Sequence, residues 1–259
     1  MIVDCHVHSC GEETAADVLK GMDAAGVDRI LLMSYEYITD EKDLWPELER
    51  LSKLCAEAPD RLYSLATVDP RFPSAPGLYR RAVEELGYKG LKMLPNHWYP
   101  YDDCAMRMYE VMQELETPGI FHSGILYGQI YLDSSRFCRP AYFEAVIHYP
   151  KARFALAHIG WPWCEECTAV FGRFRNWHHR GGAPKPQMFI DLTPGGWTVD
   201  QLKRTIDYAG ADSILYGSDT NTKSMDHLKN SLEKHRRIFD ELELPKEDQA
   251  KMLGRNVMT

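Results

Sequence analysis

The sequence IVDCHVHS, residues 2–9, combines the apolar residues of a buried β-strand with two histidines. Successive side chains of a strand point to opposite faces, so His6 and His8 are expected to share one face. Two core histidines satisfied only by backbone groups would be costly on one buried strand. Imidazole is a common ligand of zinc and similar divalent ions. The stretch therefore predicts a strand that begins the fold and presents two metal ligands.

The same kind of strand recurs along the chain. Short apolar runs, which are typical of parallel strands covered by helices, occur at residues 2–8, 29–34, 62–69, 90–95, 119–124, 153–160, 187–193 and 213–219. Segments with helical spacing of apolar residues separate or follow them, at 15–26, 44–58, 75–87, 104–116, 140–150, 198–210, 224–242 and 246–254. This alternation predicts an α/β fold, a (β/α)8 or TIM barrel that residues 1–259 form as a single domain.

Alternation alone would also fit a doubly wound open sheet, but the polar residues at the strand ends favour a barrel. His6 and His8 end the first predicted strand, His122 lies in the fifth, His158 in the sixth, and Asp219 ends the eighth. In a barrel, side chains at the carboxyl ends of the strands gather at one mouth. These five side chains would converge only if the sheet closed, so we expect a closed ring.

Composition excludes several classes of protein. The 259 residues carry a net charge of −8, with 44% apolar and 26% charged residues. Since no cluster of lysines and arginines offsets this balance, we expect neither a nucleic-acid nor a membrane partner. No apolar run approaches the roughly 18 residues of a membrane span. No secretory signal is visible, and the seven cysteines do not form a disulfide framework, so we expect a cytoplasmic protein that acts on a small molecule.

The motifs around the strand ends resemble those of a known superfamily. They are HVH at 6–8, GLKMLP at 90–95, FHSG at 121–124, AHIG followed by WPW at 157–163, YGSD at 216–219 and LGRNV at 253–257. Over nearly its whole length the chain resembles the amidohydrolase superfamily, and more closely the amidohydrolase-related branch that includes aminocarboxymuconate semialdehyde decarboxylase. The resemblance implies a TIM barrel of the metal-dependent hydrolase type with one divalent ion, Zn²⁺ in the first instance and Mn²⁺ as the alternative.

The resemblance also implies roles for the residues at the strand ends. His6, His8 and His122 would bind the metal, and Asp219 would be the fourth ligand and a proton carrier. His158 would stand beside the bound water as a base or an electrostatic aid. The alternatives are that His158 only orients another ligand and that Asp219 caps a helix.

Some stretches depart from the pattern or offer competing motifs. Asn221 stands where relatives often have proline, and the segment 174–187 is longer and more basic than expected. We expect His178 and His179 in that segment to lie in a mobile, solvated loop. The CEEC motif at 164–167 lacks a second pair of cysteines, so we interpret it as two thiols on a helix without a metal.

Other residues are candidates for substrate contact. Lys92 has three interpretations: a carboxylated lysine bridging two metals, which is the least favoured, a cation for a substrate carboxylate, or a solvated or ion-paired lysine at the barrel mouth. In the loop after the fourth strand, His97, Trp98 and Tyr99 would line a pocket for a ring or an unsaturated acid, with surface packing as the alternative. Arg136 is a further cation for an acidic substrate.

Two kinds of reaction fit these residues. The first prediction is a metal-dependent hydrolase of a small, acidic cyclic, amide or lactone substrate, in which a metal-activated water attacks and Asp219 takes up the proton. The alternative is a non-oxidative decarboxylase, a carboxy-lyase, or a hydratase of an aromatic or unsaturated acid. Both need the same ligands, so the sequence leaves them open. A homodimer is also left open, because some relatives complete the site with a neighbour's arginine.

Overall fold

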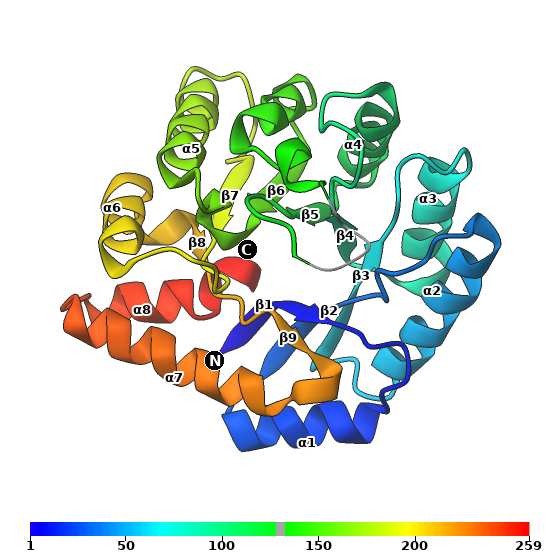
Figure 1. Ribbon diagram of the computed structural model, residues 1–259, viewed down its shortest axis with the longest axis horizontal. Coiled ribbons are helices and arrows are strands. Elements are labelled where there is room, and N and C mark those ends of the chain that lie inside the picture. Colours follow the sequence, from blue (N-terminus) through cyan, green and yellow to red (C-terminus); the bar gives the residue numbers. More distant parts are fainter. Residues whose placement is uncertain (128–132, 259) are drawn as a thin grey trace.

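The computed structural model describes residues 1–127 and 133–258, which form a ring of parallel strands surrounded by helices (Figure 1). The strands pair in the order β8-β7-β6-β5-β4-β3-β2-β1-β9, and all these pairs are parallel. Their bounds are β1 (Val3–His8), β2 (Arg29–Met33), β3 (Leu62–Thr67), β4 (Gly90–Met93), β5 (Pro118–Phe121), β6 (Arg153–Leu156), β7 (Met188–Asp191), β8 (Ile214–Leu215) and β9 (Thr220–Asn221). The predicted TIM barrel is confirmed.

The eighth strand of the barrel is split into two parts, and together they close the ring. β8 pairs with β7, and β9 pairs with β1. Between them, the Cys5 N–H donates to the Tyr216 carbonyl at 3.0 Å, and the Asp219 N–H donates to the His6 carbonyl at 3.0 Å. Asp219 itself has a positive φ of 61°. Ring closure is therefore what places Asp219 beside the histidines of β1.

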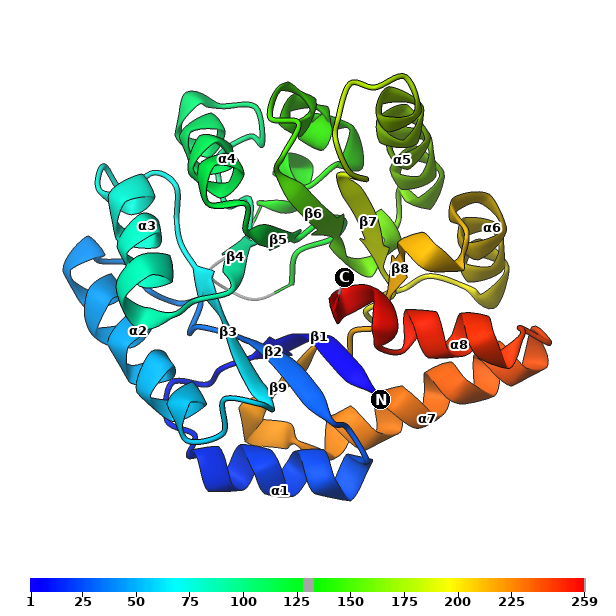
Figure 2. The ribbon, with the colours of Figure 1, turned by 180° about the vertical axis from the view of Figure 1, so that it is seen from behind.

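The helices form an outer layer around the ring, as Figures 1 and 2 show. The α-helices are α1 (Ala15–Ala25), α2 (Glu41–Ala56), α3 (Ala75–Leu86), α4 (Asp103–Leu115), α5 (Cys164–His179), α6 (Val199–Ala209), α7 (Asp226–Glu241) and α8 (Lys246–Met252). Helix α1 illustrates how the sequence sets such bounds, since the Thr14 side chain accepts the Asp17 N–H at its start and Gly26 adopts φ 70° at its end. In the described part of the chain, no helix combines the length and apolar character needed to cross a membrane.

The core has two layers. The larger lies between the strands and the helices. A smaller cluster lies inside the ring and contains Cys5, Met33, Leu65, Ile120, Ala155, Ala157, Phe189 and Leu215. The alternation of side chains along β4 shows how the layers arise: Leu91 and Met93 pack in the outer layer, whereas Lys92 between them reaches His6 inside the ring. A strand can therefore carry a polar residue into the site while its neighbours hold the helices.

Two local expectations are wrong. The segment expected as a helix at 140–150 is instead a 3₁₀ helix, Pro140–His148. Prolines bound this segment and β-branched residues near its end lower its α-helix propensity. The segment 174–187 does not begin as a loop, because α5 continues to His179. Phe174 is buried in the outer core layer, and His178 Nδ1 donates to the Ala183 carbonyl at 2.9 Å, which together order this stretch. The CEEC cysteines lie at the start of the same helix, as predicted.

A buried carboxylate, Glu13, links the loops at the carboxyl ends of the strands to one another. Its oxygens accept hydrogen bonds from Ser9 Oγ at 2.6 Å, the Cys10 N–H at 2.9 Å and Thr222 Oγ1 at 3.0 Å. Arg50 Nη2 from α2 adds an ion pair at 3.1 Å. The Glu13 side chain is only 2% exposed. These contacts join the loop after β1, the segment after β9 and α2, so Glu13 stabilises the backbone that carries His8.

We expect Glu13→Gln to lower the free energy of unfolding at neutral pH by about 2–3 kcal/mol. Burial opposes the charge, but the hydrogen bonds from Ser9 and Cys10 and the charge of Arg50 outweigh it and lower the pKa of Glu13 to about 2. A lowered pKa contributes stability above the unfolded-state value of 4.5, and this stability is lost as the pH falls towards 2.

The measurement is urea unfolding of the two proteins between neutral and acidic pH. The difference should shrink below the ordinary pKa of glutamate, and the adjacent, exposed Glu12→Gln should cause little change at any pH. An equal loss in the Glu13 and Glu12 variants would contradict the role assigned to this carboxylate.

Candidate metal centre

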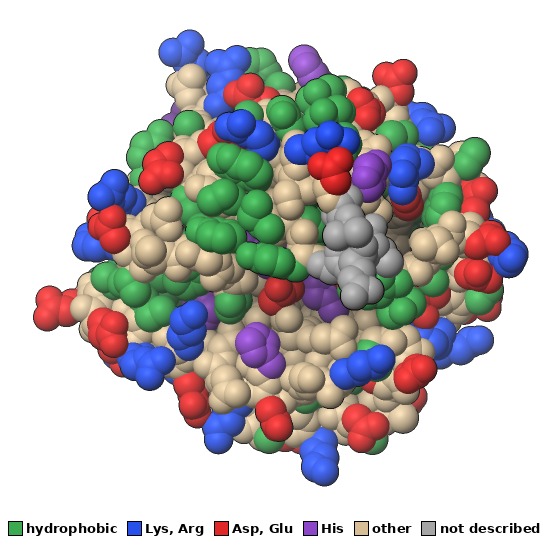
Figure 3. Space-filling model, viewed as in Figure 1, with side chains coloured by type: hydrophobic (Ala, Val, Ile, Leu, Met, Phe, Trp, Pro, Cys, Tyr) green, Lys and Arg blue, Asp and Glu red, His purple; other side chains and the backbone are tan. Residues whose placement is uncertain are grey.

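Histidine and acidic side chains meet at the mouth formed by the carboxyl ends of the strands. His6 and His8 come from β1, His122 follows β5, and His158 follows β6. Asp219 lies between β8 and β9. Figure 3 looks at this mouth and shows a hollow near its centre where purple and red side chains lie among green ones. All five predicted residues thus lie at one end of the ring.

Three donor atoms have the spacing of ligands to one ion. His6 Nε2 and His8 Nε2 lie 3.1 Å apart, and Asp219 Oδ1 lies 3.4 Å from the first and 3.3 Å from the second. Ligands at about 2.0–2.1 Å from a tetrahedral ion are about 3.3–3.4 Å apart. Ligands at roughly 2.2–2.3 Å from an octahedral ion are roughly 3.1–3.3 Å apart. The triangle therefore fits a divalent ion of either geometry.

The other nitrogen of each β1 histidine is held by a carboxylate. His6 Nδ1 donates to Asp191 Oδ2 at 2.7 Å, and His8 Nδ1 lies 3.0 Å from Glu36 Oε2. A ring nitrogen that faces a carboxylate carries the hydrogen, so Nδ1 of each ring is protonated and Nε2 is the atom that would bind an ion. His8 Nε2 also faces Asp219, so His8 must release its second proton when an ion binds. Such outer carboxylates orient ligand histidines and raise their basicity. The residues present therefore fit a metal centre in chemistry as well as in spacing.

His158 and His122 occupy the far side of the mouth. His158 Nδ1 donates to the Pro194 carbonyl at 3.0 Å, which leaves the lone pair on Nε2. Its donor atom and those of His6 and Asp219 all lie within 4.8 Å of one another. His122 Nε2 donates to the Ile125 carbonyl at 3.1 Å, so its Nδ1 carries the lone pair. The rings of His122 and His158 are 4.8 Å apart, so His122 lies beside the group of donor atoms from His6, His158 and Asp219 without being part of it.

Burial and neighbouring charges set the protonation of these groups. Burial, assisted by the charge of Lys92, lowers the pKa of His6 to about 4. Burial opposes the charge of His8 too, but Glu36 and Asp219 outweigh it and raise the pKa of His8 to about 9. Burial also disfavours the charged form of Asp219, yet the hydrogen bond from His8 and the nearby histidines hold the pKa of Asp219 well below its usual value. At neutral pH, neutral His6 and ionised Asp219 are thus ready to bind a cation.

Lys92 is fully buried beneath this centre. Its Nζ lies 2.9 Å from His6 Nε2. Burial lowers the pKa of Lys92, while the carboxylates of Asp219, Glu36 and Asp191 oppose that shift. The structure thus places an amine among the candidate ligands, and the Lys92 side chain is not solvated.

A pocket of about 250 Å³ opens onto the centre. Its walls include His8, Glu36, His122, His158 and Asp219. The described part of its lining contains none of the predicted substrate contacts: Lys92 lies buried beneath the centre, and His97, Trp98, Tyr99 and Arg136 lie elsewhere. Trp98 is buried in the outer core layer, Tyr99 and His97 pack against Phe137, and Arg136 pairs with Asp133 at 3.0 Å. These four residues lie in a neighbouring cluster after β4 and β5.

Two carboxylates of the site were missed in the sequence. Asp191 ends β7, and a polar residue at a strand end was the signal that identified the other candidates. Glu36 lies three residues beyond β2 in a loop, where no periodic pattern predicts its direction. Its position becomes visible only once the loop is folded against His8.

The closed ring, the strand-end donors and the pocket define an enzyme of the metal-dependent barrel class. A family model described as amidohydrolase matches residues 3–257, and the chain belongs to that family. This confirms the resemblance found in the sequence. No curated protein matches the chain.

Solved structures share the fold. A 2,6-dihydroxybenzoate decarboxylase from Rhizobium is 19% identical with a TM-score of 0.69, covering 99% of this chain and 97% of its own. A 5-carboxyvanillate decarboxylase from Sphingomonas paucimobilis is 19% identical with a TM-score of 0.67, covering 92% and 80%. A dihydroxybenzoic acid decarboxylase from Polaromonas sp. JS666, with bound manganese and the inhibitor 2-nitroresorcinol, is 17% identical with a TM-score of 0.65, covering 99% and 95%. At these sequence identities, the similarity shows that the fold is shared.

Proposed function

We propose that the protein is a metal-dependent decarboxylase of a small aromatic or unsaturated acid that carries a hydroxyl group beside its carboxylate. The observation that carries this proposal is Lys92, a fully buried amine 2.9 Å from His6 Nε2. In its ammonium form, a buried amine beside a cation site favours an anionic substrate over a neutral amide or ester. The pocket that opens onto the centre is small, which suits one ring with its substituents.

The chain's own residues supply binding and proton transfer in this proposal. His6, His8 and Asp219 would hold the ion, with His122 or His158 completing the set. A bound divalent ion, zinc or manganese, supplies Lewis-acid polarisation of the substrate's oxygen atoms. Lys92 binds the substrate carboxylate and offsets its charge. Glu36 and Asp191 keep His8 and His6 oriented through their Nδ1 atoms.

Asp219 is the proton carrier. Because its carboxylate is ionised before substrate binds, it can accept the hydroxyl proton of the bound acid and pass it to the ring carbon that bears the carboxylate. The bond between that carbon and the carboxylate then breaks, its electron pair returns to the ring, and carbon dioxide leaves. The product oxygen regains a proton from solvent, so the acid anion and one proton give the arene and carbon dioxide.

Two features support decarboxylation over the hydrolysis that was the first prediction. Structures with the same architecture are named as decarboxylases of hydroxylated benzoates, one of them with manganese. The buried Lys92 suits their kind of substrate. Hydrolysis of an acidic lactone remains the second candidate, and it is favoured by the free Nε2 lone pair of His158, which could accept a proton from water.

A panel assay separates the two reactions. The protein, loaded with Mn²⁺ or Zn²⁺, is offered dihydroxybenzoates, 5-carboxyvanillate, muconate-like acids and acidic lactones, and both carbon dioxide and proton release are recorded. We expect one carbon dioxide for each acid consumed, no turnover of lactones, and no turnover after chelation. Lactone hydrolysis without carbon dioxide release would overturn the proposal in favour of the hydrolase.

A further inference from the structure

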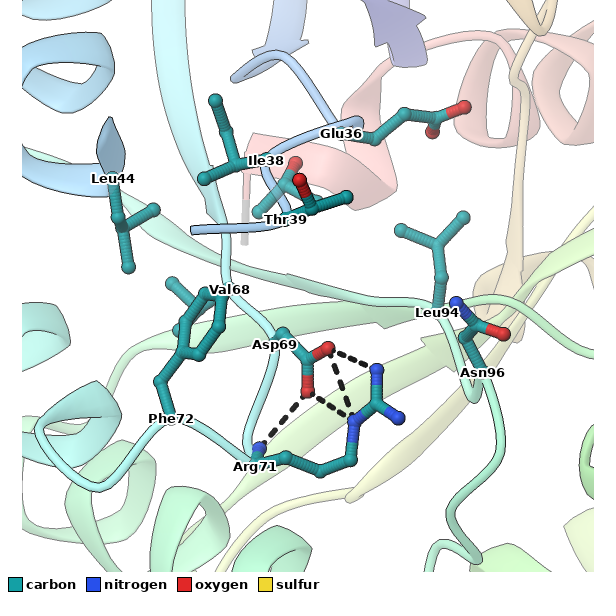
Figure 4. Close-up of a pocket in the computed structure, with 11 residues that line it drawn as sticks. Glu36, Ile38, Thr39, Leu44, Val68, Asp69, Arg71, Phe72, Leu94 and Asn96 are labelled. Carbon is teal, nitrogen blue, oxygen red and sulfur yellow. Dashed lines mark hydrogen bonds and ion pairs between the residues drawn. The ribbon is translucent and has the colours of Figure 1, made fainter. Parts of the chain in front are cut away.

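A second hollow, which we call the side pocket, lies next to the catalytic pocket. The loops after β2, β3 and β4 form it, and its walls include Glu36, Asp69, Arg71, Phe72, Leu94 and Asn96 (Figure 4). It has a volume of about 330 Å³. Glu36 and Leu94 line both pockets. The two hollows are therefore neighbouring compartments that share a wall, with Glu36 connecting the side pocket to His8.

The volumes of the two compartments suggest how they are used. The catalytic pocket alone measures about 250 Å³, which is below the roughly 300–1,000 Å³ typical of small-molecule sites. The side pocket is the larger of the two. A substrate that extends into both pockets would bury the area expected for specific binding. A substrate confined to the catalytic pocket would leave the side pocket empty.

The walls of the side pocket are chemically divided. Figure 4 shows Leu44, Phe72 and Ile38 on one side, and Asn96 with Leu94 on the other. Arg71 lies between them, where its guanidinium meets Asp69. An apolar wall that faces hydrogen-bonding groups fits an apolar group ending in a polar atom.

Two of the hydrogen-bonding groups of this pocket are donors without a partner in the described part of the chain. Arg71 donates to Asp69 through Nε at 3.0 Å and through Nη2 at 2.6 Å, and its Nη1 has no partner among residues 1–127 and 133–258. The Asn96 Oδ1 accepts from Ser134 Oγ at 2.6 Å and faces His97 Nδ1 at 2.7 Å. Its amide nitrogen has no partner in the same described ranges. The Arg71 side chain is 45% exposed and Asn96 is half-buried, so an acceptor oxygen on the ligand would take the place of water at these two donors.

The charge of the pocket selects among such oxygens. Asp69 neutralises Arg71, and Glu36 brings a further negative charge to the shared wall. A second carboxylate on the ligand would face both acidic side chains at close range, which is unfavourable. An uncharged oxygen, such as that of a hydroxyl, ether or carbonyl group, accepts from Arg71 or Asn96 without that repulsion.

We propose that the side pocket binds the part of the substrate remote from the reacting carboxylate, an apolar arm that ends in an uncharged acceptor oxygen, and that Arg71 is the specificity-determining residue for that oxygen. This inference rests on the proposed function, because it assigns the reacting carboxylate to the neighbouring metal centre. It defines the substrate as a hydroxy acid with a polar-tipped apolar extension and not a lone ring.

Calorimetric binding of three probes to the Mn²⁺-loaded protein tests this assignment. The three probes are salicylate, a salicylate carrying a 4-methoxyphenyl arm and one carrying the equally long 4-ethylphenyl arm, and each extended probe is prepared as two isomers, with the arm at ring position 4 or 5. We expect both extended probes to bind at least about tenfold more tightly than salicylate at one of the two positions. The methoxy arm should bind about five- to tenfold more tightly than the ethyl arm, as one added hydrogen bond allows.

Two variants separate the parts of the pocket. Arg71→Met should remove the preference for methoxy over ethyl and leave salicylate binding unchanged, while the exposed Arg107→Met on α4 should change nothing. Thr39→Trp, at an exposed position on the rim, should fill the pocket and remove the gain of both arms. Equal weakening of all three probes by Arg71→Met would overturn the proposal, as would extended probes that bind no better than salicylate.

The same titrations without metal distinguish this proposal from the proposed function. If salicylate binds equally with and without Mn²⁺ while the ratios between probes hold, the metal centre is misassigned but the side pocket stands. If salicylate binding requires Mn²⁺ and the arms add no affinity, the side pocket is misassigned and the metal centre stands. Absence of binding by all three probes would overturn both.

Discussion

Asp219→Asn is expected to lower the rate of turnover at saturating metal by at least about a thousandfold, because it removes both a ligand charge and the proton carrier. Asparagine keeps the size and an oxygen of the side chain, so the positive-φ turn between β8 and β9 should persist. It cannot hold a proton between substrate and product. Metal affinity should also fall, by more than the roughly 10–100-fold that loss of an outer partner of a ligand causes.

The measurement combines turnover, metal affinity and thermal unfolding. The control is Asp226→Asn, the same change at an exposed position seven residues further on, which should behave like the unchanged protein. A variant at Asp219 that binds metal as tightly as before and turns over within tenfold of the original rate would contradict both roles given to this carboxylate.

Lys92→Met is expected to lower kcat/KM for an acidic substrate by at least about a hundredfold, since a buried charge pair of about 3 kcal/mol is lost. Stability should move in the opposite direction. Lys92 is fully buried, and burial disfavours its charged form. Methionine fills a similar volume without that penalty, so the midpoint of thermal unfolding should stay the same or rise.

The combination of lost activity with retained stability distinguishes a substrate-binding lysine from a structural one. Lys89→Met is the matched control, because Lys89 lies just before β4 and is exposed. It should leave both quantities unchanged. If Lys92→Met instead destabilises the protein and binds acids normally, the lysine supports the fold and the argument for an anionic substrate fails.

The barrel could be predicted from the sequence because its evidence is repetitive. Each short apolar run recurs after a helical segment, and the polar residues stand at the ends of those runs. The places where prediction failed lack such repetition. The split between β8 and β9 depends on hydrogen bonds from Cys5 and Asp219 to distant carbonyls. The end of α5 depends on the burial of Phe174. The basic residues around Phe174 make this segment resemble a solvated loop in the sequence.

The candidate metal centre could be predicted where its residues stand at the ends of strands, and not where they lie in loops. The meeting of His6, His8 and Asp219 follows from strand alternation and ring closure, which the sequence pattern indicates. Glu36 could not be found, because a loop residue has no period and its direction depends on the folded loop. The depth of Lys92 was also undetermined, since a single lysine on a short strand fits the mouth or the interior. The donors of the side pocket come from separate loops and become neighbours only in the folded chain.

Metal binding by the purified protein tests the central claim most directly. After loading with Mn²⁺ or Zn²⁺ and removal of excess, we expect about one ion per chain by elemental analysis, and none in a variant with His6 and His8 both replaced by alanine. At a hundredfold excess of metal over its Kd, the midpoint of thermal unfolding should be roughly 5–10 °C higher than after chelation. A protein that retains no stoichiometric ion and unfolds at the same temperature with and without chelator would contradict the account.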